Sequence, residues 1–265
     1  MKNTRSVFAP KVDIPAGLYV SLSVTSILSI LGFWCVLTYG GVVSPDFLAA
    51  PHKIAVAGWE RMLDISLFEH MRASLVVIMS GFVLASVLAV PLGILTGSFQ
   101  FVAALIEPSA SFMRYIPVSA LIPLLILWVG IGIEQKIAVI FLGTFFQQLI
   151  LFADVSARVS KDLIDCSYTL GANRWQVVWR VLLPACLPGV MDNLRVTMGW
   201  AWTYLVIAEL VAANTGLGYM ILNAMRGLFT DVILLGIFVI GALGLATDLL
   251  FKALRRQLLP WSATF

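Results

Sequence analysis

Residues 160–188 read SKDLIDCSYTLGANRWQVVWRVLLPACLP, a polar, turn-containing stretch that lies between long apolar segments. Ser160 is suited to cap a helix, and Asp162 in the first turn complements the positive end of the helix dipole. Gly171 stands where a residue in the left-handed conformation commonly ends a helix. The first part of the stretch is therefore predicted to be a short helix that ends in a tight turn.

A second helix is predicted directly after this turn. Asn173 and Gln176 have the spacing of a capping box, in which each side chain bonds to the other residue's backbone N–H. Pro184 is expected to end the second helix, because proline lacks the N–H of a helical hydrogen bond and its ring clashes with the preceding turn. The stretch thus predicts helix, turn, helix.

The composition of the whole chain indicates an integral membrane protein. Of its 265 residues, 60% are hydrophobic and 12% are charged, whereas soluble domains have about 45–50% and 25%. The mean hydropathy is +0.98. The net charge of +3 is small and the basic residues are scattered, so a nucleic-acid partner is not expected. We predict an all-α, polytopic fold that contacts membrane lipid.

About 20 apolar residues are needed for each helical crossing of a bilayer, and the apolar segments predict about six transmembrane helices. The predicted crossings are residues 18–42, 73–97, 117–133, 137–155, 190–213 and 232–250. Residues 52–71 are interpreted as an interfacial helix or a loop with apolar anchors, and residues 99–113 as a surface or partly buried helix. Residues 1–70 form a tail, one crossing and an outer segment, and residues 71–265 form the core domain that includes the loop 160–188.

The distribution of basic residues predicts the orientation of the chain. Eleven Lys and Arg residues, Arg114 among them, fall on the side of the two termini and of residues 160–188, against four on the other side. Basic residues are enriched in cytoplasmic loops. Both termini and the loop 160–188 are therefore expected in the cytoplasm.

The polar loop resembles a known motif. Asp165-Cys166-Ser167, Gly171, and residues 181–184 (VLLP) follow in register the EAA motif of the inner-membrane permeases of binding-protein-dependent ABC importers, which reads EAA, three residues, G, nine residues, I-x-L-P. The glycine and the final Leu-Pro match identically. Asp165 is a conservative replacement, and the two residues after it are small like alanine.

Other segments resemble the nitrate, sulfonate, taurine and bicarbonate branch of these permeases. They are IP at 116–117 with LIP at 121–123, LWVGIG at 127–132, AEL at 208–210 and GLG at 216–218. The resemblance covers about residues 70–260. It implies a type I ABC importer permease fold in a bacterial inner membrane, with two permease subunits, expected as a homodimer, two cytoplasmic ATPases, and a periplasmic or lipid-anchored binding protein.

The resemblance also implies where the ATPase binds. In such importers the helix of the EAA motif lies in a surface cleft of the ATPase. This chain contains no G-x-x-x-x-G-K-[ST] sequence, so we expect a transport subunit that is not itself an enzyme and holds no cofactor, with ATP and Mg²⁺ bound by the partner. The residues expected to couple to the ATPase are Leu163, Asp165, Cys166, Ser167, Leu170, Gly171, Ala172 and Pro184.

Four polar residues within predicted crossings are candidates for the substrate path or gate. Glu209 lies in an otherwise apolar segment, where an acid is costly and usually functional or paired; a gating or structural hydrogen-bond role and a simple interfacial position both remain open. Gln147, Gln148 and Thr203 could donate hydrogen bonds to a passing oxyanion, or to a neighbouring helix.

Charged pairs near helix ends are interpreted as local contacts. Asp248 with Lys252, and Asp154 with Arg158, have the i,i+4 spacing of helical ion pairs. Asp192 and Arg195 lie three residues apart after the polar loop and are expected to stiffen the joint between that loop and the following crossing.

The function predicted from the sequence is that of a permease subunit of an ATP-driven importer of a small polar anion. Nitrate, sulfonate or taurine, bicarbonate and even a neutral pyrimidine precursor remain open as substrates. The alternatives are a stand-alone secondary transporter or channel for a small solute, and a structural membrane scaffold. The absence of a convincing intramembrane charge relay or inverted repeat argues against a secondary transporter.

Overall fold

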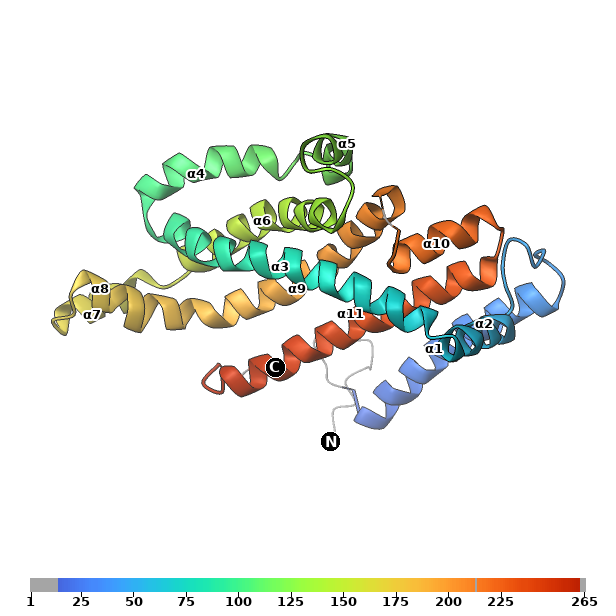
Figure 1. The fold of residues 1–265 in the computed structure, drawn as a ribbon. Helices are drawn as coiled ribbons and strands as arrows, with labels where there is room; N and C mark the ends of the chain where they lie inside the picture. Colours follow the sequence, from blue (N-terminus) through green and yellow to red (C-terminus); the bar gives the residue numbers. More distant parts are fainter. Residues whose placement is uncertain (1–13, 213, 263–265) are drawn as a thin grey trace, which may run out of the picture.

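A computed structural model describes residues 14–212 and 214–262 of the chain, and this part is helical throughout, as predicted (Figure 1). The helices in chain order are α1 (Ala16–Tyr39), α2 (Pro51–Leu63), α3 (Ser66–Ser98), α4 (Gln100–Met113), α5 (Val118–Val129), α6 (Ile133–Ala157), α7 (Lys161–Thr169), α8 (Arg174–Val177), the π-helical turn η1 (Val178–Leu182), α9 (Leu183–Ala212), α10 (Leu217–Arg226) and α11 (Thr230–Leu258).

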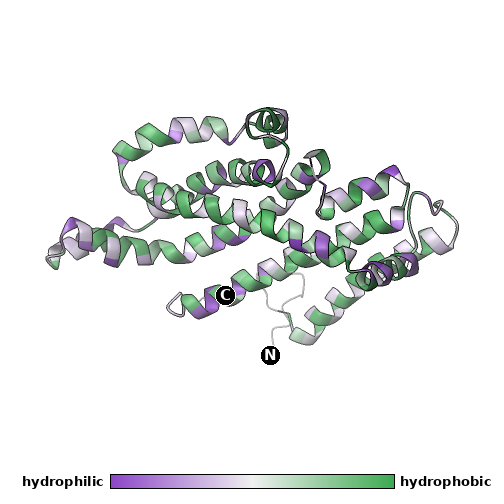
Figure 2. Ribbon diagram, in the orientation of Figure 1, coloured by the Kyte–Doolittle hydropathy of each residue, from purple (hydrophilic) through white to green (hydrophobic). Residues whose placement is uncertain are grey.

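The long helices α3, α6, α9 and α11 pack along one another and define the long dimension of the molecule (Figure 1). The α7–α8 hairpin projects at one end of them, and α2 and α10 lie at the other. We call these the hairpin end and the α10 end. Hydrophobic residues dominate the long helices between the two ends (Figure 2). Five described helices are long and apolar enough to cross a membrane, or six when the bent pair α4 and α5 counts as one crossing.

The prediction that residues 117–133 form the third crossing by themselves is wrong. Helix α5 has only 12 residues, a length of about 18 Å against the roughly 30 Å of a bilayer core. Helices α4 and α5 instead form one unit that bends by 95°. Pro117 explains the bend, because a residue that precedes proline is disfavoured in the helical conformation. The segment at residues 99–113, predicted as a separate surface helix, is the first arm of this elbow.

Two segments at the α10 end also differ from the prediction. Residues 52–71 are not one interfacial helix, because Ile65 adopts a left-handed φ of 65° that separates α2 from the start of α3. The segment between the predicted crossings 190–213 and 232–250 contains the ten-residue helix α10. The sequence pattern does not predict α10, because this helix is short and has glycines at its start.

Pro184 does not end the second helix of the hairpin, contrary to the prediction. Helix α8, the π-helical turn and α9 form one run of 38 residues, Arg174–Val211. The N–H of Leu183 bonds to the C=O of Val178, five residues earlier. This wider π-turn removes the need for a Pro184 N–H, so proline is tolerated at the start of α9. The hairpin is consequently continuous with a membrane-crossing helix.

Small residues set the contact between α3 and α6, the most extensive helix pair in the molecule. A Cβ atom added to Gly81 would lie 2.8 Å from Ile140 Cβ, and one added to Gly93 would lie 2.6 Å from Phe152 Cβ. At Gly97 an added Cβ would meet Ser156 Cβ at 2.9 Å as well as the backbone of α6. Close backbone approach replaces the hydrophobic effect as the source of helix association inside a membrane.

Replacing Gly97 with valine should therefore destabilise the protein, by about 1–3 kcal/mol or more, because overpacked contacts force the helices apart. Gly32→Val is the matched control, since a Cβ at Gly32 on α1 meets no heavy atom within 4 Å. Unfolding of the purified protein in detergent, followed by circular dichroism, measures the difference. Equal stability of the two variants would contradict the close contact of α3 and α6.

Candidate functional site

The hairpin has the backbone geometry that its sequence predicts. Gly171 has a φ of +85°, in the left-handed region where glycine is favoured. The N–H of Gln176 donates to Asn173 Oδ1, and the N–H of Asn173 donates to Gln176 Oε1, both at 2.9 Å, which confirms the capping box. Ser160 precedes α7 as predicted, but its side chain makes no capping hydrogen bond.

Four of the residues predicted to couple to an ATPase lie on α7, which has one anchored face; Leu170, Gly171 and Ala172 follow this helix, and Pro184 lies on α9. Ile164 packs against the cluster that contains Phe152 and Leu182, and this contact leaves the opposite face of α7 open. Leu170 at the tip is 83% exposed. Of the predicted coupling residues, Leu163, Asp165, Cys166, Leu170 and Gly171 are exposed, and Ser167, Ala172 and Pro184 are partly buried.

The hairpin also exposes aromatic side chains that the sequence analysis did not select. Tyr168 on α7, Trp175 on α8 and Trp179 on the π-helical turn are all exposed at the hairpin end. Aromatic residues are frequent anchors of protein interfaces. We call Leu163, Tyr168, Leu170, Trp175 and Trp179 together the hairpin surface.

Glu209 lies at the opposite end and is fully buried. The Ser74 hydroxyl of α3 donates to its two carboxylate oxygens at 2.8 and 3.0 Å, and the N–H of Gly218 donates to Oε2 at 2.8 Å. The N–H of Leu217 in turn donates to Ser74 Oγ at 2.8 Å. One carboxylate therefore joins α3, α9 and the beginning of α10. We call Glu209, Ser74 and residues 216–218 the Glu209 cluster.

The two glycines of this cluster make room for the carboxylate. Gly216 has a φ of +120°, and a Cβ added to it would overlap the Glu209 carboxyl group. A Cβ added to Gly218 would lie 2.7 Å from Glu209 Cβ. The AEL and GLG segments are thus parts of one site. The partner Ser74 was not found from the sequence, because it lies 135 residues away on another helix.

The remaining predicted path residues do not converge on Glu209 or on one another. Gln148 is buried, and its amide nitrogen donates to Ser86 Oγ at 3.1 Å and to Thr197 Oγ1 at 3.2 Å, which is interhelical bonding between α3, α6 and α9. Thr203 is exposed on the outer side of α9. Gln147 is partly buried and lines a cavity of 230 Å³ beside the α4–α5 elbow.

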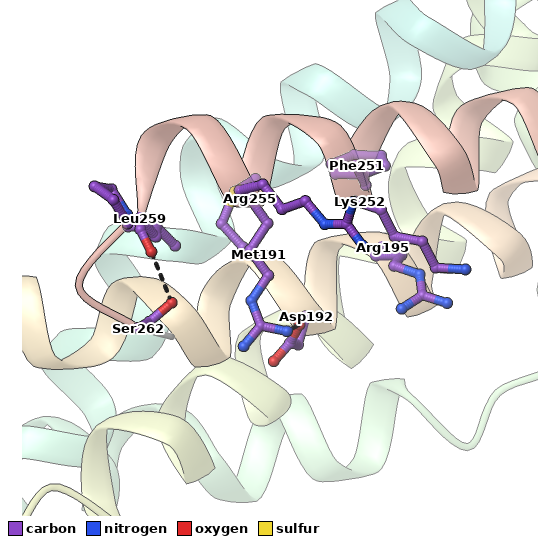
Figure 3. Close-up of a pocket in the computed structure, with 10 residues that line it drawn as sticks. Met191, Asp192, Arg195, Phe251, Lys252, Arg255, Leu259 and Ser262 are labelled. Atoms are coloured by element: carbon purple, nitrogen blue, oxygen red, sulfur yellow. Dashed lines mark hydrogen bonds and ion pairs between the residues drawn. The ribbon is translucent and has the colours of Figure 1, made fainter. Parts of the chain in front are cut away.

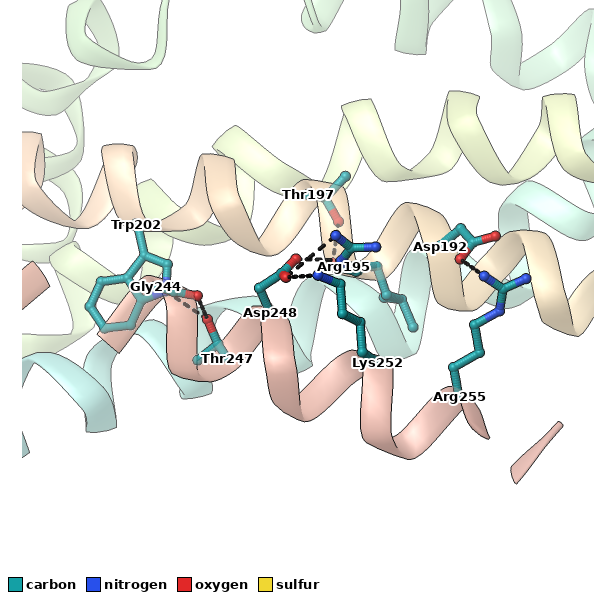
Figure 4. A network of polar contacts seen from close by, with 10 residues as sticks. Asp192, Arg195, Thr197, Trp202, Gly244, Thr247, Asp248, Lys252 and Arg255 are labelled. Carbon is teal, nitrogen blue, oxygen red and sulfur yellow. Dashed lines mark hydrogen bonds and ion pairs between the residues drawn. The ribbon is translucent and has the colours of Figure 1, made fainter. Parts of the chain in front are cut away.

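An ionic network links α9 to α11 near the hairpin end (Figure 4). Asp248 of α11 pairs with Arg195 of α9 and, at 2.9 Å, with Lys252, which confirms the predicted Asp248 and Lys252 pair. Arg255 pairs with Asp192 at 2.8 Å. Asp192 and Arg195 thus bond to α11 and not within their own helix, because α11 presents opposite charges to both. No ion pair between Asp154 and Arg158 occurs in the described ranges.

The same residues surround a cavity with a volume of 730 Å³ (Figure 3). Its walls come from α9 and from the end of α11 and carry Asp192, Arg195, Lys252, Arg255 and Arg256. Three of the four cations already have acidic partners. In the ranges that the structure describes, no group of three or more His, Cys, Asp or Glu side chains could hold a metal ion.

These features define a class of protein: a polytopic membrane subunit with a rigid helical hairpin at one end of its crossing helices. Residues 89–260 match the family described as the binding-protein-dependent transport system inner membrane component. The chain belongs to this family and is an ABC transporter permease of the inner membrane with several crossings.

Two curated relatives resemble the chain over nearly their whole lengths. The taurine transport system permease protein TauC of Escherichia coli (strain K12) is 35% identical over 252 residues, which are 93% of this chain and 92% of the relative. The putative aliphatic sulfonates transport permease protein SsuC of Bacillus subtilis (strain 168) is 34% identical over 236 residues, 89% of this chain and 86% of the relative.

The fold is also that of solved ABC importer permeases. A chain in the crystal structure of a bacterial alginate ABC transporter, in complex with an alginate pentasaccharide-bound periplasmic protein, superimposes with a TM-score of 0.61 at 13% identity. The match covers 91% of this chain and 96% of that chain. The predicted type I importer fold is therefore confirmed.

Removal of the Glu209 side chain should loosen the α10 end. Glu209→Ala leaves the Ser74 hydroxyl and the Gly218 N–H without an acceptor, at a cost of about 1–3 kcal/mol of unfolding free energy. The measurement is unfolding in detergent, with Glu107→Ala on the exposed face of α4 as the control. If Ser74→Ala and Glu209→Ala had fully additive effects in the double variant, the bond between the two residues would be contradicted.

Proposed function

We propose that this chain is the membrane-spanning subunit of an ATP-driven importer of a small sulfonate or a related polar anion. Family membership supports the transport role, and the names of the taurine and aliphatic sulfonate permeases support the substrate class. Two copies of the chain form the translocation path. A periplasmic or lipid-anchored binding protein delivers the substrate at the α10 end.

The observation that carries this proposal is the unbroken helical run from the hairpin to the Glu209 cluster. Helix α8, the π-helical turn and α9 span Arg174–Val211, and Glu209 at the far end bonds to α3 and α10. A displacement of the hairpin is transmitted along this run to the α10 end. The chain thereby has one element that a partner at either end could shift between two states.

The hairpin surface is the proposed contact with a cytoplasmic ATPase. Large apolar side chains at the tip, such as Leu170, have no packing partner within the described chain, and Asp165, Cys166 and Ser167 keep the helix narrow enough to enter a groove. Gly171 supplies the sharp turn that presents α7 next to α8. ATP and Mg²⁺ bind to the ATPase, since this chain has no phosphate-binding loop sequence.

The proposed orientation places the hairpin end and both termini in the cytoplasm. The basic cluster of Arg195, Lys252, Arg255 and Arg256 lies toward the hairpin end, in agreement with the enrichment of Lys and Arg on the cytoplasmic side of membranes. The α10 end then faces the periplasm and the binding protein.

Reconstitution tests the proposed function directly. The chain is purified with its cognate ATPase and binding protein, placed in liposomes, and assayed for uptake of radiolabelled taurine and alkanesulfonates. We expect uptake only with ATP and with loaded binding protein. Uptake by this chain alone, driven by a solute or ion gradient, would establish the secondary transporter instead.

A charge at the tip of the hairpin should disrupt the ATPase contact. Leu170→Asp places a carboxylate in an apolar groove, and we expect binding to the ATPase to weaken by about tenfold or more, the loss typical of a central interface residue. Leu228→Asp, at an equally exposed leucine between α10 and α11, is the control. Co-purification with the ATPase from detergent is the measurement. Wild-type binding by Leu170→Asp would remove the hairpin surface as the ATPase contact.

A further inference from the structure

Arg114 lies at the bend between α4 and α5, beside the cavity of 230 Å³ that we call the elbow cavity. The cavity is lined on α6 by residues that include Gly143 and Gln147. In the 25-residue helix Ile133–Ala157, these two positions are about 15–21 Å from each end. Arg114 therefore lies beside the middle of α6. The charge count predicts a cytoplasmic position for Arg114, because the bend between α4 and α5 cannot be seen in a count along the chain.

This arginine has no acidic partner in the structure. None of the ion pairs in residues 14–212 and 214–262 includes Arg114. Its Nη2 donates to the Tyr115 hydroxyl at 3.0 Å, and its Cζ lies 4.8 Å from the centroid of the Tyr115 ring. Its Nε is buried and has no hydrogen-bond acceptor. A cation beside the middle of a crossing helix is costly and is normally paired or functional.

The other walls of the elbow cavity supply neutral hydrogen-bonding groups. Ser119 of α5, Gln147 of α6 and Tyr204 of α9 line it, and no carboxylate does. Tyr204 fits because the facing residue is Gly143, where an added Cβ would lie 2.6 Å from the tyrosine ring. The cavity thus combines one positive charge with neutral hydrogen-bond donors, and none of the residues that line it is acidic.

We propose that the elbow cavity is the intramembrane binding site for the sulfonate head group of the transported anion. The Arg114 guanidinium donates two N–H bonds to two oxygens of the anion, a geometry that suits planar forked donors and tetrahedral oxyanions. The Gln147 amide donates to a third oxygen. Since only one full charge faces the ligand, the complex is weak enough to release the anion onward. This inference rests on the proposed function for the identity of the ligand.

A chemical test of the site needs neither ATP nor transport. The exposed Ser119 is replaced by cysteine in a full-length chain whose three native cysteines are serine, and the purified protein is treated with a sulfonate-bearing anionic methanethiosulfonate or its trimethylammonium counterpart. The ratio of the anionic to the cationic reaction rate reports the electrostatic potential at residue 119. We expect Arg114→Gln to lower the ratio of anionic to cationic rate about tenfold and Arg256→Gln to leave it unchanged.

Protection by a ligand provides the second measurement. With Arg114 intact, methanesulfonate should slow modification of Ser119→Cys more than sodium chloride does at the same ionic strength. An unchanged rate ratio in Arg114→Gln would overturn the proposal. Equal effects of methanesulfonate and chloride on the chain with Arg114 intact would also overturn it, and this result does not depend on whether the Arg114→Gln variant folds.

Transport provides a comparison of two neighbouring glutamines. In the reconstituted importer, Gln147→Leu should lower the number of sulfonate molecules imported per ATP hydrolysed, whereas Gln148→Leu should reduce thermal stability because it breaks the bonds to Ser86 and Thr197. Arg114→Lys should retain part of the uptake that Arg114→Gln loses. If the wild-type importer transported no sulfonate, the proposed function would be refuted. The modification rates of Ser119→Cys would still test the anion site, because they do not depend on transport.

Discussion

The bonds of the Glu209 carboxylate are the constraint on which the arrangement of the helices depends. A buried charged group is costly unless donors surround it, and here the donors come from Ser74 of α3 and from the N–H of Gly218. Both glycines next to the carboxylate are required by space, and one also by its positive φ. The carboxylate is fully buried and bonds to groups of two neighbouring helices.

Glu209 anchors one end of α9, and the hairpin is attached to the other end. The hairpin is attached through a π-helical turn to the same helix that carries Glu209. Ion pairs from Arg195 and Asp192 to α11 brace that helix near the hairpin end. The helix continues through Pro184. In the proposed importer, this continuous helix carries a movement of the hairpin toward Glu209.

Two kinds of polar residue inside the crossings differ in their surroundings. Gln148 and Glu209 are saturated by neighbours and stabilise helix contacts, whereas Arg114 and Gln147 face a cavity, and Arg114 lacks an acceptor for Nε. Adjacent positions on one helix, such as Gln147 and Gln148, thus have different environments. Sequence position could not separate them, because the direction of each side chain depends on which helix packs against which face.

The helical membrane class, the presence of about six crossings and the local geometry of the hairpin could all be predicted from the sequence. These features depend on composition, hydrophobic length and short-range capping, as in Gly171 and the Asn173–Gln176 box. Only the tertiary structure decided that α4 and α5 form one bent unit, that the helix continues through Pro184, and that Ser74 bonds to Glu209. Those outcomes depend on contacts between residues far apart in the chain, and no local pattern encodes them.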